Sequence, residues 1–499
     1  MKPLPGAPVS LEIELKLALP TSDPSALAKR LSRTPVLARR KATQLHLHNI
    51  YYDTPELLLR QQRIALRLRR LGDAANPQWL QTLKTTGRGN SALSRRGEWE
   101  MPVRHAALSL KLLKDTPWSD IDPDGVVFAA LAPAFETNFE RTSWLVRRRD
   151  GGVVEVALDI GQIVAGAQQS ALCELELELK AGPVTALFEV AQQIARDIAV
   201  LPFTASKAQR GYALTHGEMS QAVRAQAQAL TSDLSLPETA QHVLGEMFSQ
   251  FTGNLNTLLS SDDPEVVHQA RVGWRRFKSA LRLFRPALAL DSVPCGQALQ
   301  TLLTCLGKLR DLDVAAGETL APLADAYIDG DPRRAQSWQA MTLALTRACE
   351  LQRKTVRYAL QEPAAGAGLL ATTQWLTNLV DASAARVAQP ESKVSLRHWV
   401  RQRILHLHEQ LELARKQADK PDHLHRVRIL AKRMRYDVEA LRDLLPKKRS
   451  ERWYQQASRL QTSLGASRDL MQAAALVAEL DVDRGLVEFL RGLAIGQTR

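Results

Sequence analysis

The first 212 residues contain short segments in which apolar and charged residues alternate, and this period of two ends near Gly217. Such alternation places every second side chain on one face of a β-strand. The alternating segments are residues 11–16, 64–69, 79–84, 97–100, 153–159 and 172–180, and helical spacing interrupts them at 25–31 and 185–198. The pattern predicts a β-rich α+β domain over residues 1–217.

After a polar stretch at residues 218–236, interpreted as a linker, apolar residues recur at intervals of three and four. This spacing is typical of amphipathic helices. The predicted helices are residues 240–259, 264–284, 296–309, 337–361, 369–387, 396–417, 423–445 and 450–464. Residues 237–499 are therefore expected to form an all-α domain.

The formal net charge of +13 indicates an anionic partner. The four cysteines form no C-x-x-C pair, so neither a disulfide framework nor a zinc knuckle is predicted. The sequence has no apolar run of about 18 residues, which is the length that a membrane span requires. We therefore expect a cytoplasmic protein with no membrane partner, and the sequence predicts no particular oligomeric state.

The predicted strands carry charged residues in groups on single faces, and like charges recur within each group. These faces hold Glu12, Glu14 and Lys16; Arg67 and Arg69; Arg96, Glu98 and Glu100; and Glu174, Glu176 and Glu178. Like charges repel at this spacing unless a counter-charge or a metal ion lies between them. Carboxylates suit Mg²⁺ or Mn²⁺, and arginine forks suit phosphate oxygens. A sheet that curls with these faces inward could hold a metal-bound phosphate chain.

These residues resemble the motifs of the CYTH superfamily of triphosphate tunnel metalloenzymes, which includes class IV adenylate cyclases, thiamine triphosphatases and inorganic triphosphatases. The matching segments are Glu12-Ile-Glu-Leu-Lys16, Tyr51-Tyr-Asp-Thr54, Leu66-Arg-Leu-Arg69, Lys84, Arg96-Gly-Glu98, Arg141 before Trp144-Leu-Val146, Asp159, Glu176-Leu-Glu178 and Ser206-Lys-Ala-Gln-Arg-Gly211. The resemblance covers about the first 215 residues. It implies a closed antiparallel tunnel of eight strands that hydrolyses inorganic triphosphate to diphosphate and phosphate with Mg²⁺ or Mn²⁺. In this scheme one metal ion orients the triphosphate and a second activates water.

The resemblance also implies roles for individual residues. The catalytic residues would be Glu12, Glu14, Lys16, Glu176 and Glu178. The metal-site carboxylates would be Glu12, Glu14, Glu98, Asp159, Glu176 and Glu178. The triphosphate ligands would be Lys16, Arg67, Arg69, Lys84, Arg96, Arg141 and Lys207. The register of the last acidic strand stays open, because Glu174 shares the face of Glu176 and Glu178.

The helical half contains an internal repeat, which predicts two related bundles at residues 237–365 and 392–480. The segment His268-Gln-Ala-Arg271-Val-Gly-Trp-Arg275-Arg276-Phe-Lys278 is matched by His425-Arg-Val-Arg428-Ile-Leu-Ala-Lys432-Arg433-Met-Arg435. Further on, Leu306-Gly-Lys-Leu-Arg310-Asp311 is matched by Leu464-Gly-Ala-Ser-Arg468-Asp469, and both are interpreted as turns. In each copy the basic residues line one helical face and favour a phosphate-rich ligand.

This half resembles the CHAD domain, which is often fused behind a CYTH domain and is associated with polyphosphate binding. The resemblance implies that polyphosphate is bound by His268, Arg271, Arg275, Arg276, Lys278, Arg282, His425, Arg428, Lys432, Arg433 and Arg435. The two histidines are candidates for anion donors, for metal ligands or for ordinary polar residues at a helix start. Tryptophans are dispersed and basic residues share strands with acids, which argues against a nucleic-acid partner.

Three functions stay open from the sequence. The tunnel suits an inorganic triphosphatase, and adenylate cyclase or thiamine triphosphatase activity would use the same fold. A non-catalytic scaffold that binds polyphosphate is the third possibility.

Overall fold

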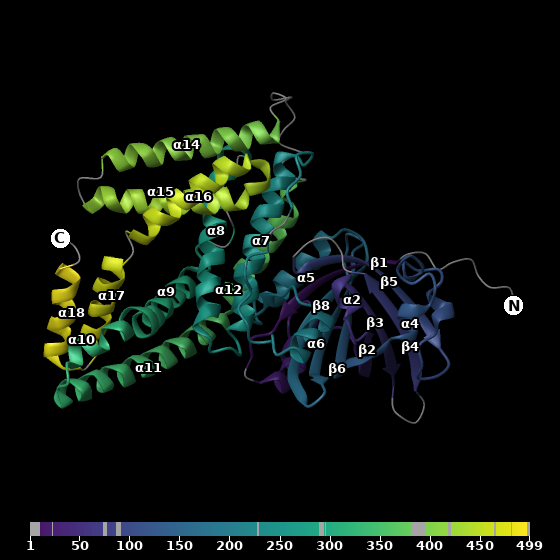
Figure 1. Cartoon of the computed structure of the whole chain (residues 1–499). Coiled ribbons are helices and arrows are strands. Elements are labelled where there is room, and N and C mark those ends of the chain that lie inside the picture. Colours follow the sequence, from purple (N-terminus) through teal and green to yellow (C-terminus); the bar gives the residue numbers. More distant parts are fainter. Residues whose placement is uncertain are drawn as a thin grey trace. The chain divides into compact units, whose positions relative to one another are not determined.

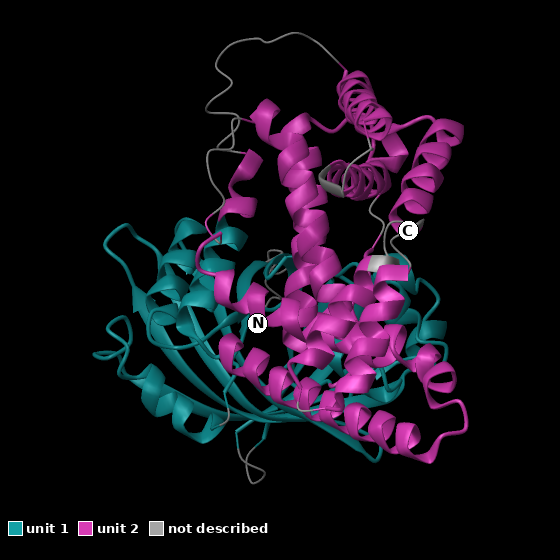
Figure 2. Ribbon diagram, turned by 90° about the vertical axis from the view of Figure 1, so that its left-hand side faces the viewer, with its two compact units in different colours: residues 1–221, 259–261, 361–374 teal, residues 222–258, 262–360, 375–499 magenta. Residues whose placement is uncertain are grey.

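The computed structural model describes residues 10–21, 23–72, 77–85, 91–226, 229–288, 294, 296–380, 395–417, 421–463, 466–480 and 482–496. The chain divides into two compact units (Figure 2). The first holds residues 1–221, 259–261 and 361–374, and the second holds residues 222–258, 262–360 and 375–499. The sequence-based boundaries at 217 and 237 stay a proposal.

The first unit is built on eight long antiparallel strands that close into a barrel (Figure 1). The strands are β1 (Ser10–Ala18), β2 (Ala42–Asp53), β3 (Ile64–Leu71), β4 (Gln78–Thr85), β5 (Leu93–Val103), β6 (Ala132–Arg147), β7 (Val153–Ala165) and β8 (Gln168–Ala181). They pair in the order β5-β4-β3-β2-β6-β7-β8-β1, and a further pairing of β5 with β1 closes the ring. The predicted eight-stranded antiparallel tunnel is confirmed.

Apolar and charged side chains alternate along β1, so the barrel wall has an apolar outer side and a charged inner side. Leu15 and Leu17 are fully buried in an apolar cluster with helix α5 (Thr185–Ala195) on the outer side of the wall. Glu14 and Lys16 lie between them in sequence and therefore face the interior, where both are also buried. Small elements complete the unit: α1 (Leu27–Leu31), α2 (Leu58–Gln61), α3 (Trp118–Ile121), α4 (Val126–Ala129) and β9 (Leu201–Pro202).

Helix α6 (Lys207–Thr215) packs against β6, β7 and β8 from the interior side and fills part of the barrel. A capping box starts it, in which Ser206 and Gln209 satisfy each other's backbone N–H groups. Tyr212 meets Phe135 of β6 edge to face, with ring centroids 5.0 Å apart. A Cβ on Gly211 would lie 2.1 Å from the Phe135 ring, so this close approach requires glycine.

A helix from far along the chain also belongs to the first unit. Helix α12 (Pro363–Thr377) joins it through residue 374. Its Leu370 is fully buried in the apolar cluster of β1 and α5, and the Nε2 of Gln192 donates to Oε1 of Gln374 at 2.6 Å. A Cβ on Gly366 would lie 2.1 Å from the carbonyl oxygen of Val200. The backbones therefore touch where only glycine fits.

The second unit is helical. Its longer helices are α7 (Leu236–Thr257), α8 (Pro264–Leu288), α9 (Gln300–Val314), α11 (Pro332–Leu360), α14 (Leu396–Lys416), α15 (Pro421–Ala440), α16 (Lys447–Ser463), α17 (Ala466–Ala478) and α18 (Arg484–Gly496), with the short α10 (Ala324–Ile328). The repeat appears as two antiparallel pairs, α7 with α8 and α14 with α15. The pairs meet where the Oγ of Ser279 on α8 donates to Asp437 on α15 at 2.8 Å. In the described part of the chain no helix is long and apolar enough to span a membrane.

The structure corrects the sequence analysis in three places. Strands β2 and β6 and the helices α17 and α18 were not predicted. The helix predicted at 369–387 ends at 377, with residues 381–387 outside the described part. The first G-x-x-R-D segment lies inside α9 rather than in a turn. In its second copy, Leu464 and Gly465 lie outside the described residues.

Candidate active site

The barrel encloses a charged cavity of about 520 Å³. Twelve of the thirteen residues assigned to the tunnel line it; the exception, Asp159, is fully buried behind the lining. The basic residues of the lining outnumber the acidic ones, which predisposes the cavity to bind an anion. The basic residues are Lys16, Arg60, Arg63, Arg67, Arg69, Lys84, Arg96, Arg141, Lys180 and Lys207. The acidic residues are Glu12, Glu14, Glu98, Glu100, Glu155, Glu176 and Glu178.

The β-register sets opposite charges against each other at most places on the inner wall. Glu12 lies opposite Arg96, Lys16 opposite Glu176, Lys84 opposite Glu98 and Arg141 opposite Asp159. Like charges face each other at two places. Asp159 lies opposite Glu174, and Glu178 lies between Glu14 on one side and Glu155 on the other. Carboxylates this close destabilise the sheet unless a cation lies between them.

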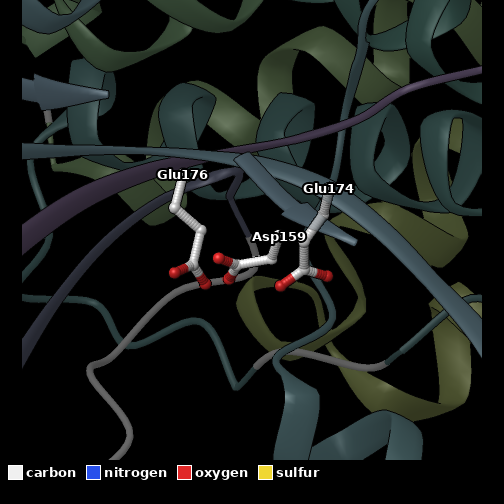
Figure 3. Close-up of side chains that lie close together, drawn as sticks. All are labelled: Asp159, Glu174 and Glu176. Carbon is white, nitrogen blue, oxygen red and sulfur yellow. The ribbon is translucent and has the colours of Figure 1, made fainter. Parts of the chain in front are cut away.

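Where Asp159 faces Glu174, the protein supplies the cation itself, in the form of Lys207. Asp159, Glu174 and Glu176 turn their carboxylates toward one another, with ligand oxygens within 4.8 Å (Figure 3). The Nζ of Lys207, at the start of α6, lies 2.6, 2.5 and 3.0 Å from oxygens of these three residues. Burial would lower the pKa of Lys207, but the three carboxylates hold its pKa above the usual value. The lysine occupies the centre that a metal ion would need.

Glu176 is the meeting point of the basic side chains. Its Oε1 accepts from Lys16 at 2.5 Å and from Lys207 at 3.0 Å, and its Oε2 accepts from Arg141 at 2.6 Å. Burial would raise the pKa of Glu176, but these three cations hold the pKa well below its usual range. The carboxylate is therefore ionised at any ordinary pH.

The acidic residues of β1 are held by β4 and β5. The Nζ of Lys84 donates to Glu12 at 2.9 Å, and the Nε of Arg96 donates to Glu12 at 2.6 Å. Arg96 also pairs with Glu14, whose Oε1 lies 3.0 Å from the Nζ of Lys16. Burial would raise the pKa of Glu12, but Lys84 and Arg96 outweigh it and lower the pKa. The E-x-E-x-K strand thus faces the cavity with its charges already in place.

At the second place, around Glu178, fewer cations offset the repulsion between carboxylates. Lys180 pairs with Glu178 at 2.6 Å and with Glu155 at 3.1 Å. Burial, with the charges of Glu12 and Glu155, raises the pKa of Glu178. A further cation beside Glu14 and Glu178 would offset this repulsion.

Two basic side chains of the lining have a lowered pKa. Burial and repulsion by Arg67 and Arg141 lower the pKa of Arg69 to about 10. Burial and repulsion by Arg96 and Arg67 likewise lower the pKa of Lys84. A bound anion would relieve this repulsion, so the cavity is electrostatically prepared for phosphate.

Sequence reasoning missed several residues of the lining. Glu155 and Lys180 continue the alternating faces of Asp159 and of Glu178, so strand periodicity could have found them. Arg60 and Arg63 precede the alternating segment and gave no such signal. Glu174 was considered, and the structure places it with Asp159 and Glu176 rather than in the cavity lining.

The helical unit carries a second basic group where its two repeats meet. Burial and the charges of Arg275, Arg428 and Arg468 lower the pKa of Lys432 to about 8. Burial and Arg275 also lower the pKa of Arg271, whose Nη1 lies 2.9 Å from where a Cβ on Gly307 would stand. Glycine at position 307 of α9 therefore leaves room for this guanidinium. The residues of this basic group come from α8, α15 and α17.

The other residues of the predicted polyphosphate site are placed differently. Arg276 is 5% exposed and joins α8 to α7 by bonds to Gln250 at 2.6 Å and Glu246 at 3.1 Å, so its charge is used within the fold. Arg433 lies beside Asp437, and the Arg435 guanidinium lies over the Tyr436 ring at 4.8 Å. The exposed residues are Lys278, Arg282 and His425. His268 is half-buried, and its Nδ1 has no hydrogen-bond partner among the described residues.

Comparison with known proteins finds two family models and several relatives. The CYTH domain model matches residues 10–212, and the CHAD domain model matches residues 242–478. An inorganic triphosphatase of Haemophilus influenzae is 34% identical over 205 residues, which are 41% of this chain and 54% of that protein. The match therefore spans about half the length of this curated relative.

Solved structures also match. The CHAD domain of the plant Ricinus communis is 28% identical with a TM-score of 0.47, covering 55% of this chain and 90% of that one. A Hippeastrum protein, described as an adenylyl cyclase with a dominant triphosphatase activity, is 19% identical with a TM-score of 0.31, covering 40% and 95%.

The closed eight-stranded barrel with its E-x-E-x-K strand, the duplicated helical pairs and the two family matches lead to one conclusion. The chain belongs to the CYTH family in its first part and to the CHAD family in its second.

Proposed function

We propose that the barrel hydrolyses inorganic triphosphate to diphosphate and phosphate with the help of a divalent cation. The observation that carries this proposal is the lining of the cavity, where six basic side chains and four carboxylates face one space: Lys16, Arg67, Arg69, Lys84, Arg96 and Arg141, with Glu12, Glu14, Glu176 and Glu178. The similarity to an inorganic triphosphatase supports the same reaction. A linear triphosphate matches a narrow space lined with cations on several strands.

The residues present fit Mg²⁺ or Mn²⁺. Carboxylate oxygens are the ligands these ions prefer, and the cavity offers them on β1 and β8. Glu14 and Glu178 lie opposite each other, and Glu12 and Glu176 are their neighbours on the same faces. These four residues would hold the ion, while Asp159 and Glu174 anchor Lys207. When bound, the ion would neutralise phosphate charge and activate water.

The basic side chains would bind and orient the substrate. Arg67, Arg69 and Lys84 come from β3 and β4, while Lys16, Arg96 and Arg141 come from β1, β5 and β6. In the structure they pair with carboxylates, and a phosphate chain would exchange those contacts for its own oxygens. Because the donors are fixed on strands, little rearrangement is needed as charge shifts toward the leaving phosphate. No covalent nucleophile is required.

The test is phosphate release from inorganic triphosphate, ATP, thiamine triphosphate and long-chain polyphosphate, each with Mg²⁺, with Mn²⁺ and with EDTA. We expect turnover of inorganic triphosphate that EDTA abolishes. Formation of cyclic AMP from ATP would assign the cyclase reaction instead, and preferred cleavage of thiamine triphosphate would assign that substrate. Turnover of none of them would contradict catalysis and leave a polyphosphate-binding scaffold.

We also propose that the helical unit binds polyphosphate at the basic group where its repeats meet. The support is the concentration of like charge around Lys432, with Arg275, Arg428 and Arg468 as neighbours. Like charges held together by the fold are stabilised by a polyanion.

The pKa of Lys432 gives this binding a pH dependence. Lys432 is protonated below about pH 8 and loses its charge above it, so polyphosphate affinity should fall between pH 7 and pH 9. In Lys432→Ala the affinity at pH 7 should be roughly tenfold lower, and the pH dependence in this window should flatten. Titration calorimetry of the full chain at fixed salt measures both effects, with Lys354→Ala as the surface control. Tighter binding of duplex DNA than of polyphosphate at equal salt would contradict the partner.

A further inference from the structure

The connection between β2 and β3 carries two arginines that the proposed hydrolysis does not use. Arg60 and Arg63 both line the barrel cavity. Arg60 lies on α2, which is a single helical turn, and Arg63 lies between this turn and β3. Arg67, four residues further on, lines the same cavity from within β3. The cavity therefore has a basic edge at this connection.

The backbone of this connection is strained on both sides of α2. Leu57 has a φ of 59° and Arg63 has a φ of 58°. Among the described residues Asp329 is the one other non-glycine residue with a positive φ. Glycine adopts this conformation freely, whereas a residue with a side chain is strained in it. The fold thus places an arginine at the cavity where its backbone favours glycine, and such strain is found at binding sites.

A buried carboxylate holds the strained turn in position. Asp53 is 2% exposed and accepts from the backbone N–H groups of Leu59 at 2.8 Å and Arg60 at 3.0 Å. It also accepts from the hydroxyl of Tyr212 on α6 at 2.7 Å. The turn is therefore fixed both to the end of β2 and to the helix that carries Lys207. Arg63, which follows this turn, therefore has a fixed backbone position relative to the cavity.

Arg60 is half-buried and Arg63 is exposed, and both interact with other groups of the protein. The Nη2 of Arg60 donates to Glu218 at 2.8 Å, and its guanidinium lies over the Tyr212 ring at 5.7 Å. Arg60 thus helps to hold the edge of the cavity together. Arg63 is exposed to solvent while it lines the cavity, which is the position of a residue that meets the end of a ligand.

Arg63 lies outside the basic residues proposed to hold three phosphates. Arg63 stands before β3 and is exposed, whereas Arg67 stands within the strand four residues further on, so the two side chains start from different depths of the cavity. Arg67 is 6% exposed and lies among the inner residues. A chain that fills the inner site and continues toward the β2–β3 connection would bring its next phosphate to Arg63.

We propose that Arg63 is a specificity residue that binds the phosphate following the third one, so that the tunnel also accepts linear chains longer than triphosphate. This inference rests on the proposed hydrolysis. For inorganic tetraphosphate the reaction consumes one water molecule and yields triphosphate and phosphate. The guanidinium suits this role because it binds phosphate oxygens in two-pronged fashion and stays charged.

The experiment compares kcat/KM for inorganic tetraphosphate and inorganic triphosphate in the full-length protein with one metal ion. In Arg63→Gln the value for tetraphosphate should fall roughly tenfold while that for triphosphate changes less than about twofold. Arg63→Gly removes both the charge and the backbone strain and should show the same selective loss. Arg63→Lys should retain part of the native kcat/KM for tetraphosphate, because lysine keeps the positive charge. Arg39→Gln, at another exposed arginine of the same unit, is the matched control.

Three results would overturn the proposal. Equal loss for both substrates would place Arg63 at the inner site or give it a structural role. Unchanged kinetics in Arg63→Gln, or a native protein that cleaves triphosphate but not tetraphosphate, would remove the outer subsite while leaving the proposed function intact. Failure of the native protein to cleave triphosphate would refute the proposed function itself, and the inference with it.

Discussion

Replacing Glu176 by glutamine should reduce phosphate release from inorganic triphosphate by roughly a hundred- to a thousandfold or more. Glu176 contacts Lys16, Arg141 and Lys207 and faces the cavity between β1 and β7. Glutamine keeps the size of the side chain but removes the negative charge that would bind the cation and orient three basic groups. Most of the loss should appear in kcat, because the orientation of the phosphate chain changes as well as its affinity.

The matched control is Glu140→Gln. Glu140 is exposed, and it lies on β6 next to Arg141, on the opposite face of the strand. The Glu140→Gln variant should retain native kinetics and native metal dependence. Single-turnover measurements with saturating triphosphate separate the chemical step from binding. Near-native activity of Glu176→Gln would contradict the assignment of the cavity as the site of hydrolysis.

Replacing Lys207 by methionine should destabilise the barrel by about 3–5 kcal/mol at neutral pH. The ammonium group is 5% exposed and lies within 3.0 Å of Asp159, Glu174 and Glu176. Methionine fills a similar volume but leaves these carboxylates with one cation fewer. Arg141 still binds Asp159 and Glu176, so the loss should be partial rather than complete.

The pH dependence of this loss follows from the carboxylates. Burial would raise the pKa values of Asp159 and Glu176, but the cations around them lower both. Their contribution to stability is present above the unfolded pKa values near 4 and is lost as pH falls through the lower folded values. Without Lys207 the folded pKa values rise, and the carboxylates take up protons earlier. The difference between the variant and the native protein should therefore shrink from pH 7 toward pH 4.

Hydrogen exchange of the β7 and β8 segments in the full chain measures this effect, because it reports on local opening of the barrel. Lys41→Met, at an exposed lysine before β2, should leave the exchange unchanged. Equal protection in Lys207→Met at pH 7 would show that the carboxylates are satisfied without the lysine.

Strand periodicity predicted which side chains share the cavity but not which of them touch. The E-x-E-x-K segment alternates strictly, so the inward side of Glu12, Glu14 and Lys16 follows from sequence alone. Glu174, Glu176 and Glu178 lie on one face, so periodicity cannot decide which of them meets Asp159. The register between β7 and β8 decides it, and that register is a property of the closed barrel.

The strands that the sequence analysis missed lack an apolar-to-charged contrast. On β6 the interior face carries Phe135 and Phe139 as well as Arg141, because α6 fills that part of the barrel with apolar side chains. Both faces of the strand are therefore partly apolar, and the period of two is obscured. The contact of α12 with β1 and α5 was also invisible, because nothing local in residues 363–374 specifies a partner so far away in the chain.

That contact has a consequence for the order in which the protein can assemble during synthesis. The barrel strands are complete once residue 181 has been translated, yet the apolar surface around Leu15 and Leu187 receives Leu370 only after 189 more residues. At a translation rate of roughly 5–20 residues per second this interval lasts about 10–40 s. For that time the nascent barrel exposes a patch that its own later sequence will cover. Synthesis thus leaves an interval in which the barrel strands are complete while this part of their apolar surface is still uncovered.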